Sequence, residues 1–255
     1  MRNDALVVKY GSEAATNDHG MDIVRVEGYA ADLCTERRQS GLIVVSSGAV
    51  AVGECLWRDL HGEEELPGKQ ALAMLGSAEA TLVWQRAFAK HGVSAGQLLL
   101  THREIDDGKE GPVLKRAIKA CLKAGIVPVV NENDPVSKKE LAKLAYGGDN
   151  DGLASHIAID MKARTLIIFT QKGGLFDNRG REQATLTSTH FDSARDMVAD
   201  RESKRRKGKG TGGMTTKLDA AIDAAEAGVD TYIARAGTPV REVLEGQMGT
   251  RLIAK

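Results

Sequence analysis

The sequence predicts an α/β fold in three layers, an αβα sandwich with a mainly parallel central β-sheet between two layers of helices. Two observations lead to this prediction. Short apolar runs rich in β-branched residues recur along the chain, and longer segments in which apolar residues have helical spacing separate them. The runs are apolar almost throughout, which is typical of parallel strands buried on both faces. The 255 residues, 42% of them hydrophobic, are enough for a substantial core, and we expect a single domain.

Six apolar runs are the predicted strands. In chain order they are 5–8 (ALVV), 42–45 (LIVV), 97–100 (QLLL), 126–130 (IVPVV), 165–169 (TLIIF) and 231–234 (TYIA). Between them, apolar residues have helical spacing, for example at Ile23, Val26, Ala30 and Leu33, and at Leu114, Ile118, Ala120 and Leu122. The segment from Asn178 to Gly210 is polar and weakly periodic and ends in the basic run 204–209. We expect this segment to leave the sheet and to carry a mobile loop.

Polar residues follow four of the predicted strands. They are KYGS (9–12), SSGAVAVG (46–53), NENDPV (131–136) and TQKGG (170–174). The segments that enter the strands, such as ARTL and HGVS, are ordinary by comparison. Because ligands of parallel α/β sheets bind where loops leave the carboxyl ends of the strands, we predict a ligand site at this edge. The alternative is a set of short polar turns.

Charge and composition exclude several classes of function. Lys plus Arg equal Asp plus Glu at 35 each, so the chain has no general field for nucleic acid or an anionic membrane. The apolar runs are far too short to cross a bilayer, and the N-terminus shows no export signal. Three widely spaced cysteines, Cys34, Cys55 and Cys121, are typical of reduced, buried thiols, and we expect a cytoplasmic protein.

Acidic and amide groups are crowded in the stretch YGGDNDGLA, where Asp149, Asn150 and Asp151 follow two glycines. Like charges at adjacent positions repel one another, so a cationic or hydrogen-bond-donating partner would explain the pattern. The alternative is a loop followed by a helix N-terminus, where Asp and Asn are favoured caps.

Two glycine motifs are candidates for phosphate loops. GEEELPGKQ (62–70) is not a P-loop, because five residues separate its glycines and Gln70 stands where Ser or Thr is needed. GKGTGG (208–213) satisfies GxGxxG, but no strand precedes it, which disfavours a dinucleotide fold. The wider stretch KGKGTGG (207–213) is a basic glycine loop that leads into an Ala-rich helix, and Gly228 is expected to end that helix. The start of such a helix can bind phosphate, and Lys217 in its first turns would add a positive charge. The alternative is a flexible linker beside a solvated helix.

The ordered motifs resemble the amino acid kinase family and, within it, the glutamate 5-kinases. They are VVKYGS (7–12), VVSSGAVAVG (44–53), KQALAMLG (69–76), QLLLT (97–101), GIVPVVNENDPV (125–136), GGDNDGLA (147–154) and GTGGMTTKLDAA (210–221). The resemblance implies ATP-dependent phosphorylation of the glutamate side-chain carboxylate, the first step toward proline, with Mg²⁺ carried by the nucleotide. It also implies a homo-oligomer and a downstream reductase that takes the acyl phosphate. Many members carry a C-terminal PUA domain, and we expect this chain to be the kinase domain without it.

The resemblance also implies roles for individual residues. Lys9 and Lys217 would neutralise the transferring phosphoryl group, and Asp151 would organise them. The amino acid would be bound by Ser47, Gly48, Ala49, Asn131, Asp134 and Asn150. The nucleotide would be bound by Lys9, Gly11, Thr170, Gln171, Thr211, Gly212, Gly213, Met214, Thr215, Thr216 and Lys217. Residues up to about 150 would mainly bind the amino acid, residues 151–255 would mainly bind the nucleotide, and no residue is expected to ligate a metal directly.

This chemistry needs charge neutralisation and no base. A glutamate side chain, with a reference pKa near 4.3, is already ionised at neutral pH, and none of the six histidines lies in the motifs. The family typically has Asp after the fifth strand where this chain has Gln171, and Tyr10 and Glu13 also depart from its first loop. Two alternatives follow: a kinase for another acidic amino acid or glutamate derivative, and a catalytically silent ligand-binding homologue.

Overall fold

The computed structural model describes residues 3–36, 41–101, 104, 108–136, 150–203 and 213–254. The chain divides into two compact units, and each is described by itself. The first unit is Tyr10–Lys138. The second unit combines Met1–Lys9 with Lys139–Lys255, so it is built from both ends of the chain.

The first unit contains three parallel strands in the order β5-β6-β4. Their bounds are β4 Leu42–Ser46, β5 Ala95–Leu100 and β6 Val127–Glu132. Val129 of β6 lies opposite Val44 on one side and Gln97 on the other. The helices are α1 Ser12–Ala15, α2 Ile23–Glu36, α3 Ala49–His61, α4 Lys69–Ala89 and α6 Gly111–Lys123, and a small hairpin pairs β2 Thr16–Asn17 with β3 Gly20–Met21.

Two glycines let α3 and α4 pack with their backbones in contact. A Cβ atom on Gly53 of α3 would lie 1.9 Å from the carbonyl oxygen of Leu72, and one on Gly76 of α4 would lie 2.1 Å from that of Ala49. Only glycine fits at such an approach, because any side chain would overlap the neighbouring backbone. The crossing therefore fixes the start of α3, which follows directly on the loop after β4.

An aromatic cluster forms part of the core of the first unit. Trp84 of α4 is fully buried, and its ring lies 5.4 Å from that of Tyr10 and 5.9 Å from that of Phe88, measured between centroids. Tyr10 also stacks on Tyr29 at 4.5 Å. Tyr10, which departs from the family's usual first loop, is thus a core residue, and burial raises the pKa of its hydroxyl well above the usual value.

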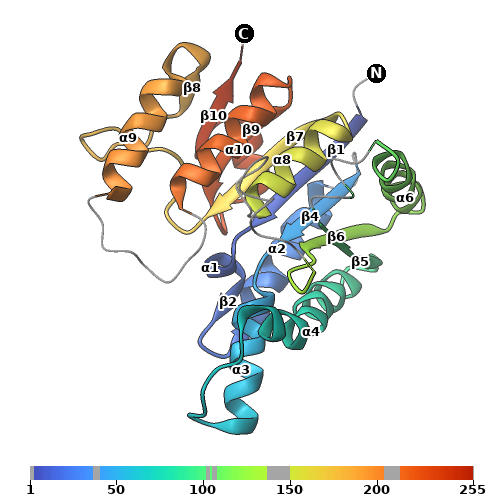
Figure 1. Ribbon diagram of the computed structural model, residues 1–255. Coiled ribbons are helices and arrows are strands. Elements are labelled where there is room, and N and C mark those ends of the chain that lie inside the picture. The colour runs from blue at the N-terminus through green and yellow to red at the C-terminus, as the bar shows by residue number, and fades with distance from the viewer. Residues whose placement is uncertain are drawn as a thin grey trace. The chain divides into compact units, whose positions relative to one another are not determined.

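The second unit contains five strands in the order β1-β7-β9-β10-β8 (Figure 1). Their bounds are β1 Asn3–Tyr10, β7 Ala163–Thr170, β8 Thr185–Thr187, β9 Asp230–Arg235 and β10 Thr250–Ile253. β7 and β9 pair in parallel, as do β10 and β8, whereas β9 and β10 are antiparallel. The helices are α8 Asn150–Asp160, α9 Phe191–Ser203, α10 Met214–Glu226 and α11 Val240–Leu244, with a 3₁₀ turn at Ser188–His190.

Helices α8 and α10 pack against each other, α8 on β7 and α10 on both β7 and β9, and α9 packs on α10 (Figure 1). α10 packs through small residues, and Ala221 and Ala224 are fully buried. It ends as its sequence predicts, because Gly228 has a φ of 87°, a left-handed conformation that glycine adopts without steric cost. This packing brings the first turns of α8 and α10 together, as the contacts below show.

The predicted α/β class with a mainly parallel sheet is confirmed. All six predicted apolar runs overlap strands, namely β1, β4, β5, β6, β7 and β9. The expectation that 178–210 leaves the sheet is wrong in part, since β8 pairs with β10 and α9 follows it. The basic run 204–209 lies outside the described residues. The single-domain interpretation stays a prediction.

Two smaller expectations can be compared with the structure. The three cysteines are half-buried and not fully buried as expected, because each lies on a helix that is only partly covered. Among the described residues, the structure contains no helix with the length and apolar character that a membrane span needs.

Candidate active site

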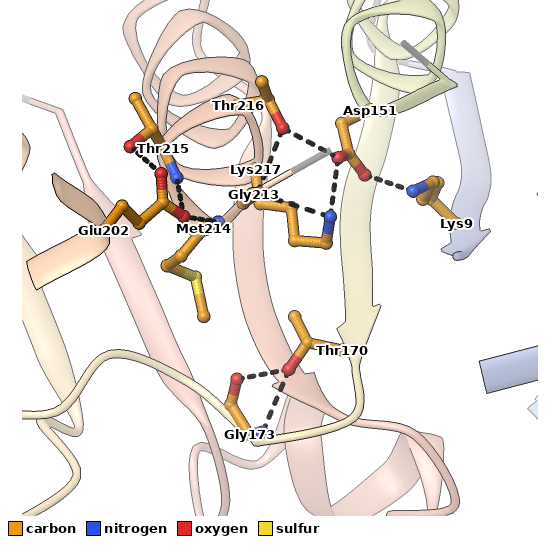
Figure 2. Close-up of polar contacts among 10 residues, drawn as sticks. All are labelled: Lys9, Asp151, Thr170, Gly173, Glu202, Gly213, Met214, Thr215, Thr216 and Lys217. Atoms are coloured by element: carbon orange, nitrogen blue, oxygen red, sulfur yellow. Dashed lines mark hydrogen bonds and ion pairs between the residues drawn. The ribbon is translucent and has the colours of Figure 1, made fainter. Parts of the chain in front are cut away.

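Three charged side chains from distant parts of the chain meet in the second unit. Lys9 lies next to the end of β1, Asp151 in the first turn of α8, and Lys217 in the first turn of α10. The Lys9 Nζ atom is 2.5 Å from Asp151 Oδ1, and the Lys217 Nζ atom is 2.9 Å from Asp151 Oδ2 (Figure 2). One carboxylate thus bridges two ammonium groups, which leaves the cluster with one positive charge in excess.

This cluster is withdrawn from water. The side chain of Asp151 is 0% exposed, that of Lys9 3% and that of Lys217 15%. Burial alone would raise the pKa of Asp151, but the charges of Lys9 and Lys217, together with their hydrogen bonds, outweigh it and lower that pKa from 3.8 to about 2. Asp151 is therefore ionised throughout the neutral range, and its charge holds two cations that would otherwise repel each other.

The first turn of α10 is joined to Asp151 at a second point. The hydroxyl of Thr216 lies 3.3 Å from Asp151 Oδ2 and 3.0 Å from the carbonyl oxygen of Gly213, and can donate to either. The Lys217 Nζ atom also lies 3.4 Å from that carbonyl oxygen. These contacts fix the direction in which the N-terminus of α10 points relative to α8.

Glu202 is a residue of this region that the sequence does not reveal. It lies near the end of α9, and its carboxylate accepts hydrogen bonds from the backbone N–H groups of Met214 and Thr215 and from the Thr215 hydroxyl, the last at 2.7 Å (Figure 2). A Cβ atom on Gly213 would lie 2.3 Å from Glu202 Oε1, so the approach requires glycine there. Glu202 is 12 positions before Met214 in the sequence, outside the spacing of local helix-capping patterns, so only the folded structure reveals the contact.

The loop after β7 is held by its own hydrogen bonds. The hydroxyl of Thr170 donates to the carbonyl oxygen of Gly173 at 2.7 Å and accepts from the N–H of Gly173 at 2.9 Å (Figure 2). The Gly174 N–H donates to Glu182 at 2.5 Å. Gln171, the next residue in the predicted nucleotide set, is exposed. Thr170 therefore shapes the turn that presents Gln171.

Arg201 joins this loop to α9. Its guanidinium donates to the carbonyl oxygens of Phe176 and Asp177, each at 2.7 Å. Arginine presents several donors in a fixed planar arrangement, which suits two adjacent carbonyl groups. The end of α9, and with it the backbone at Glu202, is thereby anchored to the loop that follows β7.

Several residues predicted to bind the amino acid lie in the first unit, at the junction of β4 and α3. The Ser47 N–H donates to the carbonyl oxygen of Tyr10 at 3.0 Å. Gly48 has a φ of 122°, and a Cβ atom there would lie 2.9 Å from the Thr16 side chain, so the turn requires glycine. Ala49 begins α3.

The other predicted residues of the first unit lie at the end of β6 or just after β6 and β1. Asn131 is buried near the end of β6, and its side-chain oxygen accepts from the N–H of Glu132 at 2.9 Å. Asp134 lies in the turn just after that strand, and Gly11 precedes α1. Glu13, on the first turn of α1, has an exposed side chain.

The predicted site residues thus fall into three groups. The second unit contains Lys9, Asn150, Asp151, Thr170, Gln171, Gly213, Met214, Thr215, Thr216 and Lys217, and brings Lys9, Asp151, Thr216 and Lys217 together. The first unit contains Gly11, Ser47, Gly48, Ala49, Asn131 and Asp134. Thr211 and Gly212, like Asp149, lie outside the described residues.

The carboxylate at the centre of the cluster is poorly suited to ligate a metal. Both oxygens of Asp151 face ammonium groups, which a divalent cation would have to displace. Within the described ranges, no group of three or more His, Cys, Asp or Glu side chains could hold an ion.

Known proteins similar to this chain include several kinases. A model of the amino acid kinase family matches residues 4–235. A curated relative from Myxococcus xanthus, named glutamate 5-kinase, is 35% identical, over 94% of this chain and 64% of that protein. Another of that name from Salmonella newport is also 35% identical, over 99% of this chain and 70% of that protein. The chain therefore spans about two thirds of the length of these relatives.

Solved structures show the same fold. A carbamate kinase from Giardia lamblia bound to AMP-PNP has a TM-score of 0.69 at 12% identity, and the match covers 99% of each chain. A second structure of the Giardia carbamate kinase has a TM-score of 0.67 at 15% identity, with 99% coverage of each chain. At this level of identity the likeness concerns the fold alone.

Proposed function

The chain belongs to the amino acid kinase family, and we propose that it phosphorylates the side-chain carboxylate of L-glutamate with ATP to give γ-glutamyl phosphate. The resemblance predicted from the ordered motifs is confirmed by the family match and by the relatives named glutamate 5-kinase. The observation that best supports the proposed reaction is the convergence of Lys9 and Lys217 on buried Asp151.

The proposed reaction has an electrostatic obstacle that this cluster is suited to overcome. A carboxylate must approach a phosphoryl group that already carries negative charge, so catalysis depends on positioning and charge neutralisation. Each unit charge at about 4 Å contributes on the order of 4 kcal/mol at an effective dielectric constant near 20. Two ammonium groups held at fixed positions, with one excess positive charge between them, therefore reduce the repulsion between the two anions as they approach each other.

Asp151 acts in this proposal as a positioning residue for the two lysines and not as a base. A carboxylate with a pKa of about 2 is a poor proton acceptor at neutral pH. The reaction needs no proton acceptor, because the glutamate carboxylate is already ionised. The buried charge of Asp151 instead keeps Lys9 and Lys217 in place while the site is empty.

The two substrates would be bound by different sets of residues. We propose that the residues of the first unit named above, with Asn150, bind the amino acid, and that Gly11, Thr170, Gln171 and the stretch 211–217 bind MgATP. Residues up to about 150 would then mainly serve the amino acid and residues 151–255 the nucleotide. We further place the reaction at the first step toward proline, in a homo-oligomer whose acyl phosphate product is consumed by a reductase.

A trapping assay tests the proposed reaction. Hydroxylamine converts an acyl phosphate into a stable hydroxamate, so we expect hydroxamate and ADP to form only when both glutamate and ATP are present. The absence of hydroxamate and of glutamate-dependent ADP would exclude the reaction. Nucleotide binding without turnover would instead support the silent homologue.

One specific residue supports a different substrate as the acceptor of the phosphoryl group. Gln171, exposed after β7, places a neutral amide where the family typically has a carboxylate, which favours a kinase for another acidic amino acid or a glutamate derivative. A panel of acidic amino acids and glutamate derivatives in the same assay separates the two. A clear preference for glutamate would exclude the second acceptor.

A further inference from the structure

The start of α10 is already bound to an anion that belongs to the protein. The Glu202 carboxylate accepts hydrogen bonds from Met214 and Thr215 in the stretch for which we propose nucleotide contacts. The first N–H groups of a helix have no partner within the helix and carry a partial positive charge, which makes them suitable donors for phosphate or carboxylate. Glu202 therefore uses the same donors that a nucleotide phosphate would need.

A phosphate and this carboxylate cannot occupy the position together. The Glu202 Oε1 atom accepts from the N–H groups of both Met214 and Thr215, so a phosphate oxygen bonded to the same two groups would have to take the same position. Two anions that share the same donors also repel each other strongly, and an N–H group bonded to one is lost to the other. One of the two must leave.

We propose that Glu202 is an internal competitor of the nucleotide phosphates, whose side chain must rotate away from Met214 and Thr215 before they can bind a phosphate. This inference rests on the proposed function, in which residues 211–217 contact ATP. The backbone at this point is held by the hydrogen bonds of Arg201 to Phe176 and Asp177, so a rotation of the side chain, and not a movement of α9, vacates the position.

Competition of this kind lowers the apparent affinity for nucleotide by the fraction of molecules in which the donors are available. It also satisfies the helix start when the site is empty, which stabilises the protein without ligand. Because ATP and ADP would need the same donors, the competitor acts on both. Its return to the helix start would favour release of the product ADP.

Calorimetric titration with ADP in the presence of Mg²⁺ tests the competition. Removing the side chain that caps a helix start typically changes the free energy of unfolding by an amount equivalent to about 2- to 30-fold in an equilibrium constant. Because ADP must displace this cap in our proposal, we expect Glu202→Ala to lower the Kd for ADP by about that factor. Glu202→Gln keeps the size but not the charge and should lower the Kd by a smaller factor. Asp196→Ala removes an exposed carboxylate from the same helix and should leave the Kd unchanged.

Other outcomes would overturn the proposal. An ADP affinity in Glu202→Ala that equals or falls below that of the wild type would mean that no competition exists. A loss of affinity that appears only with Mg²⁺ would mean that Glu202 contacts the nucleotide's metal instead. If Glu202→Ala does not fold, the Kd of Glu202→Gln for ADP is compared with that of the wild type instead, and an equal or higher value would overturn the proposal.

Failure of the proposed function gives a different pattern. If the wild-type protein binds neither ATP nor ADP and forms no hydroxamate, the kinase reaction itself is wrong. If the wild type binds ADP and forms hydroxamate, but its Kd for ADP equals those of Glu202→Ala, Glu202→Gln and Asp196→Ala, only the proposed competition is wrong. Adenosine, which lacks phosphate, should bind equally to the wild type and to Glu202→Ala, and a tighter complex with the variant would show that phosphate is not the group excluded.

Discussion

Replacing Asp151 by asparagine removes the one negative charge between two buried ammonium groups while keeping the size of the side chain. A carboxyl group whose pKa falls from 3.8 to about 2 on folding stabilises the folded protein by about 2 kcal/mol at neutral pH. Breaking a buried ion pair from one side typically costs about 3 to 5 kcal/mol, because the partner charge stays buried. We therefore expect Asp151→Asn to lose about 2 to 5 kcal/mol in the free energy of unfolding.

The loss should depend on pH in a defined direction. Since the pKa of Asp151 is lower in the folded protein, its stabilisation is fully present above the ordinary value of 3.8 and is lost as the pH falls through about 2. The difference between the wild type and Asp151→Asn should accordingly shrink by about 1 kcal/mol between pH 7 and pH 3. Urea unfolding at both pH values measures this difference.

A matched control is Asp196→Asn, which makes the same change on an exposed site of α9 and should cost less than about 0.5 kcal/mol. A loss below about 0.5 kcal/mol for Asp151→Asn at pH 7 would refute the ion-pair argument, and so would a loss that does not change with pH. This test does not require the substrate to be known.

Three further perturbations probe other parts of the structure. Lys217→Ala should lower the rate of hydroxamate formation by about 100-fold while the protein stays folded, by analogy with the loss of one preorganised donor; a rate within threefold of the wild type would contradict its role. Gly76→Ala puts a methyl group 2.1 Å from the carbonyl oxygen of Ala49 and should lower the free energy of unfolding by about 1 to 3 kcal/mol, measured by urea denaturation; an unchanged midpoint would mean that the helices can move apart. Trp84→Phe removes the 2.9 Å hydrogen bond that the indole N–H donates to the hydroxyl of Ser46, the neighbour of Ser47 in the proposed amino acid site, and should therefore raise the KM for glutamate more than it lowers kcat; an equal effect on both, or none, would contradict a role of this bond in placing the amino acid.

The sequence was a good guide wherever a single physical requirement dominates a segment. Runs such as LIVV (42–45) and LIIF (166–169) are apolar throughout because both faces of those strands are covered, and they lie in β4 and β7. Gly228 was recognisable as a helix terminator because glycine adopts the left-handed conformation most readily. Such features depend on neighbours in the sequence.

Tertiary contacts between distant residues were harder to predict. The meeting of Lys9, Asp151 and Lys217 was expected only because the ordered motifs resemble a known family, since no spacing rule connects a strand end with two helix starts. Glu202 gave no signal at all, because its role as a cap for α10 depends on how α9 packs. Tyr10 looked like a departure in the first loop and proved to be part of the aromatic core, a distinction that burial alone decides.

The second unit is closed by the first nine residues of the chain together with its C-terminal half, and this has a consequence during synthesis. A ribosome adds about 5 to 20 residues each second, so Lys9 is made about 10 to 40 s before Lys217. During that interval all of Tyr10–Lys138 is made, whereas the first strand has no α10 to meet until the interval ends. The cluster of opposite charges is therefore among the last parts of a newly made molecule to assemble.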